Sequence, residues 1–423
     1  MGPYSFDVYP MHILVLTPSF PPETTAAAVR TSAHARIWTE LGHTVTVVSS
    51  VPNFPRGKLF DGYENRWFQE RTVAGVRNIM LWTYMAPNEG VLRRTADYAS
   101  FMASAYWQSR RLAKADVILA TSPHIFVAIA GHLVARRLQI PWVFEVRDLW
   151  PAAIAGVGMG RSSVLKAVEA VELGLYRSAR RVIVLTQPFK DDLVRRGIDP
   201  GRIDVVTNGM DDGFAARRSR EETRRHLGYG EDTFLVGYVG TLGLCQNPAV
   251  LVRAAWRLRD RADIQFLIVG EGAERAKTED LARSLGLANV VFRDLVPYDE
   301  VPDILSALDL GTVVLRDHPA FHTVIPSKIF ELAAVRRPIV GAVTGEAKRV
   351  ITEIDGGICV PPGDDEALAA AILQLVTAPD MRARLGERGA KNVQTAYARR
   401  PQAKKALDSL TLAAAGKRER ELV

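Results

Sequence analysis

The strongest constraint on the fold of this chain is a regular alternation of short, apolar, β-branched runs with longer segments of helical periodicity. His12–Thr17 is typical of a buried strand, and Val45–Ser49 is typical of a second one. Between them, Ala26–Leu41 has helical periodicity and ends at Gly42. A strand, a crossover helix and a second strand in so short a span predict a βαβ unit, whose strands run parallel and are covered on both faces.

The alternation continues along the chain and starts again halfway. In the first half, the expected strands are His12–Thr17, Val45–Ser49, Val73–Asn78, Val117–Ala120, Trp142–Val146, Arg181–Leu185 and Asp204–Val206. In the second half, they are Phe234–Val239, Gln265–Val269, Val290–Phe292, Asp309–Val314, Ile339–Ala342 and Gly357–Val360. The turn-rich stretch Asn208–Gly213 and the polar run Arg217–Arg225 separate the halves. The pattern predicts an α/β fold of two Rossmann-like, doubly wound domains that face a central cleft.

The predicted domain limits follow from that separation. We expect an N-terminal domain over residues 11–207, a C-terminal domain over residues 208–398, and a C-terminal helix and tail over residues 399–423 that could cross back to the first domain. Residues 1–10 precede a second methionine and are expected to be a disordered extension. Because open α/β sheets bind ligands at the carboxyl ends of their strands, function should lie in loops that face the cleft.

Composition narrows the class of protein. Of 423 residues, 48% are apolar and 24% are charged, which is typical of a folded globular chain. The two cysteines, Cys245 and Cys359, cannot form a disulfide framework, so a cytoplasmic location is expected. The net charge of +7 is spread over short Arg pairs, so nucleic acid is not an expected partner. No secretory leader and no apolar run long enough to span a membrane are evident.

Several chemistries lack their motifs in this chain. The sequence contains no G-x-x-x-x-G-K-[ST] loop, no G-x-G-x-x-G after the first strand and no H-E-x-x-H. No two Asp residues stand two positions apart, so the D-x-D metal motif of many sugar-nucleotide enzymes is absent. Chemistry without a metal ion or cofactor is therefore expected.

A set of segments carries a family resemblance. They are Pro18–Arg30 (PSFPPETTAAAVR), Gly42–Val47, Pro52–Tyr63 (PNFPRGKLFDGY), Glu145–Pro151 (EVRDLWP), Asn208-Gly209, Val239–Thr241, Val269–Gly272, Leu295–Pro297 and Ile325–Glu331 (IPSKIFE). In this order, they resemble the retaining, family-4-like glycosyltransferases with the glycosyltransferase-B fold. PNFPRGK, EVRDLWP and IPSKIFE look most like the branch that transfers amino- or deoxy-sugars, such as N-acetylfucosamine, onto lipid-linked glycans.

The resemblance implies what each half does. The second domain would hold a nucleotide sugar, with UDP favoured over GDP or TDP, and the first would present the acceptor. That acceptor would be a glycan, a lipid-linked glycan or a small molecule. The sugar would keep its anomeric configuration, and the departing phosphate could itself take the acceptor proton, so that no protein base is required. The sequence does not fix the oligomeric state.

Candidate residues in the first half follow the first, fourth and fifth expected strands. Thr24 and Thr25 stand between the first strand and its helix, where backbone N–H groups can hold a diphosphate or its sugar, although relatives usually have two glycines here. His124 is a candidate contact of the donor sugar or acceptor. Arg147 is a candidate counter-charge for the diphosphate, and Asp148 could bind or orient the acceptor hydroxyl. A plain helix cap and a local ion pair are the structural alternatives.

Candidate residues in the second half centre on IPSKIFE. Thr241 and Gln246 stand where many relatives carry an Arg and a Lys that neutralise the diphosphate, so Lys328 becomes the first candidate for that role. Glu331 corresponds to the second carboxylate of the family's E-x7-E pattern, which grips the ribose hydroxyls, and Thr323 replaces the first. The full set of candidate donor contacts is Thr24, Thr25, Gly240, Thr241, Gln246, Gly270, Glu271, Arg293, Leu295, Thr323, Val324, Ile325, Ser327, Lys328 and Glu331, with His124, Arg147, Asp148 and Lys328 as candidate catalytic residues.

One helical segment, Arg93–Arg111, carries an apolar stripe of Tyr98, Phe101, Met102 and Ala105 between Arg pairs. A stripe of this kind is more often part of a core. The flanking arginines would also suit peripheral contact with the inner face of a membrane.

Three other functions stay open from the sequence. The first is a natural-product or small-molecule glycosyltransferase of the same fold. The second is a nucleotide-sugar-binding protein with weakened catalysis, which would explain the missing Arg/Lys pair and the missing first carboxylate. The third and least favoured is a nucleotide-sugar epimerase of the same two-domain shape.

Overall fold

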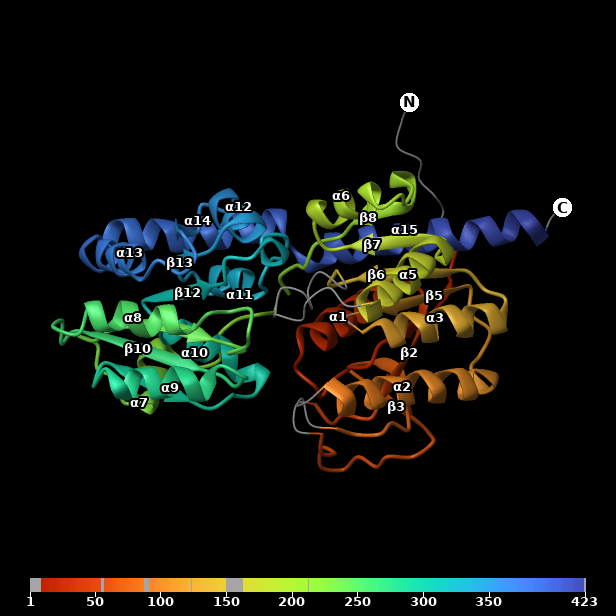
Figure 1. The fold of residues 1–423 in the computed structure, drawn as a ribbon, viewed down its shortest axis with the longest axis horizontal. Helices are drawn as coiled ribbons and strands as arrows, with labels where there is room; N and C mark the ends of the chain where they lie inside the picture. Colours follow the sequence, from red (N-terminus) through yellow and green to blue (C-terminus); the bar gives the residue numbers. More distant parts are fainter. Residues whose placement is uncertain are drawn as a thin grey trace. The chain divides into compact units, whose positions relative to one another are not determined.

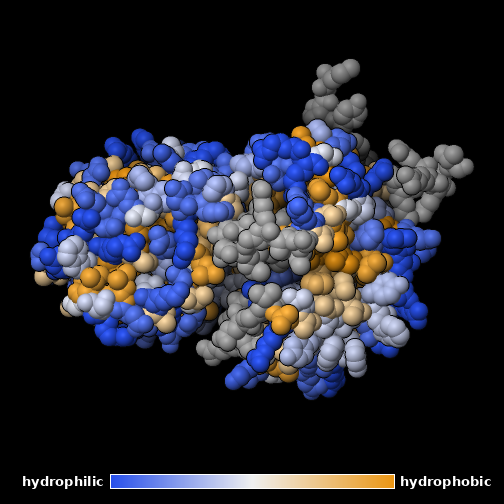
Figure 2. Space-filling model, in the orientation of Figure 1, coloured by the Kyte–Doolittle hydropathy of each residue, from blue (hydrophilic) through white to orange (hydrophobic). Residues whose placement is uncertain are grey.

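The computed structural model describes residues 9–54, 57–86, 91–122, 124–149, 163–211 and 213–421. These residues form two α/β units, each built around its own sheet (Figure 1). Unit 1 contains the described residues up to Thr207 together with those from Arg400 onward, and unit 2 contains Asn208–Arg399. Hydrophilic side chains cover much of the visible face of each unit, with apolar patches between them (Figure 2).

The sheet of unit 1 has the order β3-β4-β2-β1-β5-β6-β7-β8 in the described part of the chain. Neighbouring strands are parallel except β3 and β4. The strands are β1 (His12–Leu16), β2 (Thr44–Ser50), β3 (Phe68–Val73), β4 (Val76–Leu81), β5 (Val117–Thr121), β6 (Trp142–Val146), β7 (Arg181–Val184) and β8 (Ile203–Val205). Helices on both faces bury the central strands, which explains their continuous apolar runs.

The helices of unit 1 begin and end where local signals place them. Thr25 caps α1 by accepting a hydrogen bond from the N–H of Ala28, and Gln139 ends α3 in the left-handed conformation. The helices are α1 (Ala26–Glu40), α2 (Val91–Gln108), α3 (Ile125–Leu138), α5 (Ser163–Ser178), α6 (Gln187–Arg195) and α15 (Arg399–Glu421). On α2, Phe101 and Ala105 are buried, which confirms the core interpretation of the stripe at these two positions.

One predicted strand was wrong. Val73–Asn78 is not a single strand, because the chain reverses at Ala74 and Gly75, which have φ angles of 50° and 77°. Positive φ at both residues of a two-residue turn matches the twist of a hairpin, so β3 and β4 pair antiparallel on either side of it. The short apolar run hid the turn, since an Ala-Gly pair is a weak turn signal.

The last helix belongs to unit 1. Ala406, Leu407 and Leu410 of α15 are buried in the same core as Trp38 of α1. The indole N–H of Trp38 also donates to the carbonyl of Ala403 over 2.8 Å. The N-terminal sheet is therefore completed by residues almost four hundred positions later in the chain.

Unit 2 is a parallel sheet of order β11-β10-β9-β12-β13-β14 within the described residues. Its strands are β9 (Phe234–Val239), β10 (Ile264–Val269), β11 (Val290–Arg293), β12 (Leu310–Val314), β13 (Ile339–Ala342) and β14 (Gly357–Val360). Its helices are α7 (Arg220–Leu227), α8 (Ala249–Arg257), α9 (Arg275–Ser284), α10 (Val301–Ala307), α11 (Lys328–Ala334), α12 (Gly345–Glu353), α13 (Asp365–Thr377) and α14 (Pro379–Ala396).

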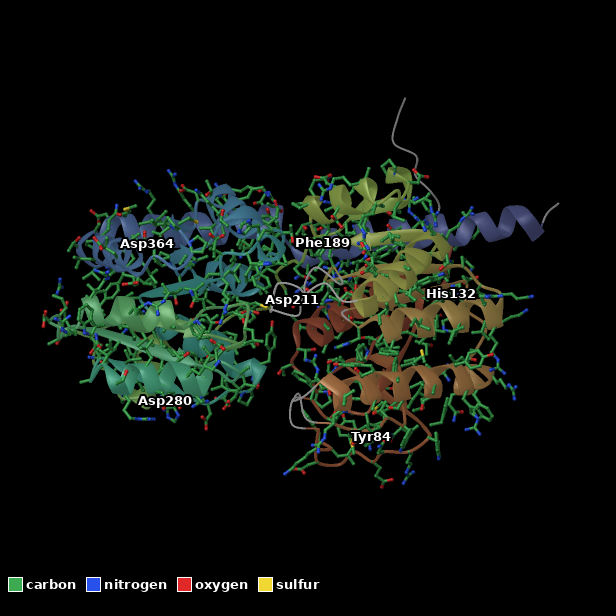
Figure 3. The ribbon with its side chains drawn as sticks, viewed as in Figure 1. Tyr84, His132, Phe189, Asp211, Asp280 and Asp364 are labelled. Carbon is green, nitrogen blue, oxygen red and sulfur yellow. The ribbon has the colours of Figure 1, made fainter. Side chains whose placement is uncertain are left out.

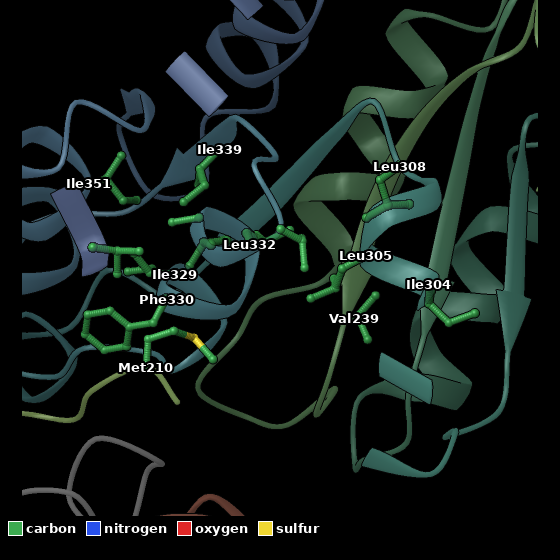
Figure 4. Close-up of a cluster of buried hydrophobic side chains, with 14 of the residues drawn as sticks. Met210, Val239, Ile304, Leu305, Leu308, Ile329, Phe330, Leu332, Ile339 and Ile351 are labelled. Atoms are coloured by element: carbon green, nitrogen blue, oxygen red, sulfur yellow. The ribbon is translucent and has the colours of Figure 1, made fainter. Parts of the chain in front are cut away.

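The core of unit 2 lies on both faces of this sheet. Along β9, Val236 and Tyr238 face one cluster of buried side chains, while Leu235 and Val239 face the other. Figure 4 shows the second cluster, where Ile329, Phe330 and Leu332 of α11 pack beside Met210 and Ile339. This packing anchors α11 and so fixes the polar residues at its first turn. In neither unit does a described helix combine the length and the apolar run that a membrane crossing requires.

Candidate active site

A cavity of about 280 Å³ lies in unit 1 at the carboxyl ends of its central strands. It brings together four of the predicted residues, Thr25, His124, Arg147 and Asp148. Thr24 is exposed and is not among the residues that line it. The other polar side chains in the wall are Ser19, Glu23, Ser50, Asn53, Arg94, Asp97 and Tyr98.

His124 is held between α2 and α3. It stands at the N-cap position of α3 without a capping hydrogen bond from its side chain, and its ring stacks on Tyr98 with centroids 3.3 Å apart. An Nη of Arg94 lies 3.3 Å from Nε2 of His124, and since a guanidinium only donates, Nε2 must accept, which leaves the proton on Nδ1. Burial, aided by Arg94, lowers the pKa of His124 to about 3. A histidine held neutral in this way can form hydrogen bonds but cannot serve as a general acid at ordinary pH.

Arg147 and Asp148 follow β6. The backbone N–H of Arg147 donates to the hydroxyl of Ser122 over 2.8 Å, which joins the loops after β5 and β6. Burial raises the pKa of Asp148, and the charge of Arg147 opposes that shift. The two side chains therefore present an arginine and a carboxyl group of weakened acidity to the same cavity.

An ion pair beneath the cavity holds this arrangement. Nε of Arg30 on α1 lies 3.0 Å from Oε1 of Glu145 on β6, and both side chains are almost fully buried. The other nitrogens of Arg30 donate to the carbonyls of Val206 and Thr207, while Thr121 donates to Glu145. Burial alone would raise the pKa of Glu145, but Arg30 and Arg147 bring it below its usual value. Glu145 in EVRDLWP is thus a structural carboxylate that ties α1 to the sheet.

Three charged residues of this cavity were not predicted from the sequence: Glu23, Arg94 and Asp97. Glu23 accepts hydrogen bonds from the N–H groups of Asn53 and Phe54 and from the hydroxyl of Ser19, and burial raises its pKa. Burial, followed by the charge of Glu23, raises the pKa of Asp97 to about 7. Arg94 and Asp97 stand three residues apart, so they share one face of α2, and this spacing was the available signal.

In unit 2, two loops approach each other closely after β9 and β10. The N–H of Leu242 donates to the carbonyl of Glu271 over 2.8 Å, and the N–H of Gly240 donates to Val269 over 2.9 Å. Gly270 has a φ of 147°, and a Cβ at this position would lie 1.9 Å from the carbonyl oxygen of Gly240. Glycine is therefore required here for the backbones to meet.

Lys328 lies beside these loops, at the first position of α11. Its Nζ is 3.4 Å from the centroid of the Tyr238 ring and 3.2 Å from the place where a Cβ on Gly240 would stand. Among the described residues, this buried Nζ has no hydrogen-bond partner. Burial lowers the pKa of Lys328 to about 7, although Glu331 partly offsets the shift. A lysine that lacks an acceptor in this setting is poised to bind an anion.

Glu331 lies one turn further along α11. Burial raises its pKa to about 7, while the charges of Lys328 and Arg399 oppose the shift. In the segment before α11, Val324 and Ile325 pack their side chains against the core, and Thr323 donates to the carbonyl of Ala320 over 3.0 Å. Within the described part of the chain, the backbone N–H groups of Val324, Ile325 and Ser327 have no hydrogen-bond acceptor.

The remaining predicted donor contacts are engaged locally or exposed. Gln246 accepts from the N–H of Gly243, so its amide is folded onto its own loop. Glu271 forms an ion pair with Arg275 over 2.6 Å. Arg293 donates to the carbonyl of Leu227 over 2.8 Å, at the end of α7. Thr241 and Leu295 are exposed. Of Lys328 and Arg293, the two predicted cations of unit 2, only Arg293 is engaged by a hydrogen bond within the described residues.

Both halves of the chain match known families. Residues 25–209 match the glycosyl transferase 4-like domain, and residues 219–392 match the glycosyl transferases group 1. A protein of Escherichia coli (strain K12) named for glycosyl transfer in colanic acid biosynthesis is 26% identical over 384 residues, covering 87% of this chain and 93% of that protein. The 2-deoxystreptamine N-acetyl-D-glucosaminyltransferase of Streptomyces fradiae is 27% identical over 259 residues, which are 60% of each chain.

Solved structures share the fold. HepE of Anabaena, solved with UDP and glucose, has a TM-score of 0.73 at 17% identity, covering 95% of this chain and 99% of that one. Sucrose-phosphate synthase from Thermosynechococcus elongatus has a TM-score of 0.74 at 17% identity, covering 97% and 99%. The two family matches together cover most of the chain, and these folds agree with its two parallel sheets. This chain is therefore a glycosyltransferase with the glycosyltransferase-B fold, made of a glycosyl transferase 4-like half and a group 1 half.

Proposed function

We propose that this enzyme transfers a hexose or N-acetylhexosamine-type sugar from a nucleotide diphosphate, UDP being favoured, to a glycan or lipid-linked acceptor with retention of configuration. The observation that carries the proposal is Lys328, whose buried Nζ has no partner among the described residues and lies beside Gly240. Sugar transfer builds negative charge on the leaving diphosphate, and stabilising such charge is usually the largest catalytic contribution. Lys328 supplies a cation for it without a metal ion.

The donor site is assigned to the loops of unit 2. The unpaired N–H groups of Val324, Ile325 and Ser327 can bind phosphate oxygens next to Lys328. Glu331, one turn along the helix, is assigned to the ribose hydroxyls, which can donate to its two oxygens. HepE, which shares the fold, was solved with UDP and glucose, and this supports UDP as the first nucleotide to test.

The acceptor site is assigned to the cavity of unit 1. Its carboxyl groups, Glu23, Asp97 and Asp148, all have raised pKa values, so they can exchange hydrogen bonds with sugar hydroxyls. His124 stays neutral and positions a hydroxyl rather than removing its proton. The proton then passes to the departing phosphate. The Escherichia coli relative, named for colanic acid biosynthesis, supports a polysaccharide acceptor, and the amino- or deoxy-sugar branch stays our preferred donor class.

Peripheral contact with a membrane is part of the same proposal. Trp107, near the end of α2, is 69% exposed, and Arg110 lies over its ring at 5.9 Å. An exposed indole beside arginines suits the interface of an anionic leaflet. Trp107→Ala should reduce sedimentation with phosphatidylglycerol vesicles, and unchanged sedimentation would remove this element of the proposal.

A natural-product acceptor is the second candidate. The Streptomyces fradiae relative is named for an amine-bearing acceptor, 2-deoxystreptamine. Glu23 and Asp97 in one cavity would also suit an ammonium group, which favours their ionised forms. Transfer to aminocyclitols but not to lipid-linked sugars would favour this candidate.

The decisive experiment pairs donor binding with turnover. We expect UDP or a UDP-sugar to raise the melting temperature of the wild-type protein, because a ligand of the native state stabilises it. Lys328→Met should abolish the shift, whereas Lys348→Met, at an exposed position of α12, should keep it. Transfer should persist in EDTA, and the proton NMR spectrum of the product should show the donor's anomeric configuration.

Three results would contradict the proposal. If no nucleotide shifts the wild-type protein, catalysis with nucleotide sugars loses its support. If Lys328→Met binds UDP as the wild type does, the site assignment fails while the reaction class survives. Isomerised UDP-sugar in the absence of any acceptor would identify an epimerase instead.

A further inference from the structure

A second and larger cavity lies in unit 1, at the opposite ends of the strands. It is a groove of about 930 Å³, a volume in the range of small-molecule sites. Trp142 and Arg181, the first residues of β6 and β7, line it, together with the last turns of α3 and α5 and with Leu412 of α15. Trp142 and Arg147 stand at opposite ends of β6, five residues or about 17 Å apart, so the groove is separate from the acceptor cavity.

The charge of the groove is one-sided. Five arginines and His132 line it, and no acidic residue of the described chain does so. Arg181 is neutralised by Asp204, with two contacts of 2.8 Å, and Arg202 donates to carbonyls at the end of α5. The guanidinium groups of Arg136, Arg177 and Arg180 have no ion-pair or hydrogen-bond partner among the described residues. His132, labelled in Figure 3, lies on α3, and Arg136 stands in the last turn of the same helix.

Helix ends account for only part of this clustering. A cation in the last turn of a helix is favourable, which explains Arg136 on α3 and Arg177 on α5. Arg180 lies beyond α5, and Arg202 already occupies carbonyls there. Burial, followed by the charge of Arg136, lowers the pKa of His132, so Arg136 and a protonated His132 repel each other. Arg136, Arg177 and Arg180 are exposed, and no carboxylate of the described chain lines the groove beside them, so an anion bound there would relieve the repulsion among these charges.

The chemistry of the wall selects the kind of anion. The three arginines lie on α3, at the end of α5 and just beyond α5. Each guanidinium group can donate two hydrogen bonds to phosphate oxygens, and a phosphate has enough oxygens for several such groups, whereas a single carboxylate has only two. Ile140, Trp142 and Leu412 form an apolar part of the same wall. We propose that this groove is a second binding site, for an organic phosphate whose charged group lies on Arg136, Arg177 and Arg180 and whose apolar part lies against Trp142 and Leu412. A phospholipid headgroup and a soluble phosphate ester share this chemistry.

The test uses two probes that separate these sources. Inorganic pyrophosphate is titrated calorimetrically, and phosphatidylcholine vesicles with and without phosphatidylglycerol are used for cosedimentation. The triple variant Arg136→Ala/Arg177→Ala/Arg180→Ala should weaken binding of one or both probes at least tenfold. The control is the triple variant Arg218→Ala/Arg225→Ala/Arg384→Ala, which removes the same charge from exposed positions of unit 2. It should change the affinity for each probe less than twofold. A melting temperature equal to that of the wild type shows that a variant is folded. If the first triple variant is unstable, the single substitution Arg136→Glu replaces it in both binding measurements.

A spectroscopic readout locates the ligand. A phosphate bound beside Arg136 offsets its charge, so the pKa of His132, followed by NMR, should rise when pyrophosphate binds. All measurements are repeated with Lys328→Met, which should leave the groove intact, so that failure of this site and failure of the donor site are distinguishable. The proposal is overturned if neither probe binds, if both triple variants lose binding equally, or if Lys328→Met alone abolishes it.

Discussion

Lys328 carries an ammonium group into a place that water does not reach and where no acceptor of the described chain replaces the water. The Tyr238 ring offers a cation–π contact, which is weaker than the hydration that the ammonium loses. A buried ammonium group without an acceptor lowers the free energy of unfolding. Destabilising groups of this kind are found most often in active sites. The environment of Lys328 is therefore better explained by a ligand than by stability.

We predict that Lys328→Met stabilises the ligand-free protein while it removes donor binding. Because the folded state lowers the pKa of Lys328 from its ordinary value to about 7, the penalty is complete below pH 7 and fades as the pH rises towards that ordinary value. The free energy of unfolding at pH 7 should rise by about 1 kcal/mol. Urea unfolding measures this change, with Lys348→Met as a control expected to be neutral. A loss of stability would show that the ammonium is satisfied.

Donor binding should also depend on pH. Above pH 7 the free enzyme holds Lys328 mostly neutral, and a diphosphate favours the ammonium form, so binding takes up a proton. The affinity for UDP should therefore fall as the pH rises above 7, by up to about tenfold per pH unit, until the pKa of Lys328 in the complex is reached. Calorimetry at several pH values measures the slope. Glu331 also has a pKa raised to about 7, so Glu331→Gln is the control and should keep the slope. Loss of the slope in Glu331→Gln would assign the effect to Glu331 instead.

Only part of the candidate site could be read from single residues. Lys328, Glu331, His124 and Arg147 stand in short motifs beside strand ends, so their positions could be predicted. Glu23 and Asp97 could not, because their pKa values are raised by burial. Burial depends on how the helices and loops pack together. From the sequence alone, a charged residue is expected to be exposed to solvent, because most charged residues are.

At the scale of elements, the loop after β10 has no room for a side chain. The backbone of Gly270 meets that of Gly240, and the pair forms the floor beside Lys328. Parallel strands end in such loops at one edge of the sheet, where ligands bind. The geometry of the proposed donor site therefore depends on two glycines as much as on its charged residues.

Gly270→Ala should distort this floor. The added Cβ would lie 1.9 Å from the Gly240 carbonyl oxygen, and a φ of 147° is unfavourable for alanine. We expect a loss of about 2 kcal/mol in unfolding free energy and at least a tenfold loss in UDP affinity. Gly230→Ala is the matched control, because a Cβ there meets nothing within 4 Å. Thermal unfolding and calorimetry measure both, and an unchanged affinity would separate this loop from the donor site.

Strands were predictable from the sequence where burial on both faces produces a continuous run of apolar residues. β9, β13 and β14 begin and end at the predicted residues, because strands covered on both faces are continuous apolar runs. The hairpin at Ala74 was missed, because β3 lies at the edge of its sheet and mixes polar with apolar residues. An edge strand lacks the pattern that reveals a central one.

At the scale of the whole molecule, the chain passes between the units twice in the described residues, after Thr207 and after Arg399. Inside unit 2 the two passages are joined, since the N–H of Met210 donates to Tyr397 over 2.7 Å and the N–H of Arg399 donates to Met210 over 2.8 Å. A C-terminal helix that could cross back to the first domain was expected from the sequence, and the described residues from Arg400 onward do belong to unit 1. The partner of this helix, Trp38, could not be predicted, because a stripe of alanine and leucine fits any apolar face.

Removal of α15 should damage unit 1 selectively. A chain that ends at Arg399 leaves Trp38 without its hydrogen-bond acceptor and exposes the apolar residues that α15 covers. Hydrogen exchange should become fast in β1 and α1 but stay slow in β9 and β12. A chain that ends at Ala415 keeps the buried contacts of α15 and should behave as the full chain does. Slow exchange in β1 after removal of α15 would contradict its role in this core.

The place of α15 also bears on how the protein is made. The ribosome releases the residues of β1 first, yet the core around them is incomplete until the segment near Leu410 has been added. Unit 2, which lies between, has all of its strands available earlier. Protease digestion of stalled nascent chains would reveal a protected second half beside a sensitive first half. The half that is synthesised first is thus the half that matures last, and during that interval it is the part of the nascent protein most in need of a chaperone.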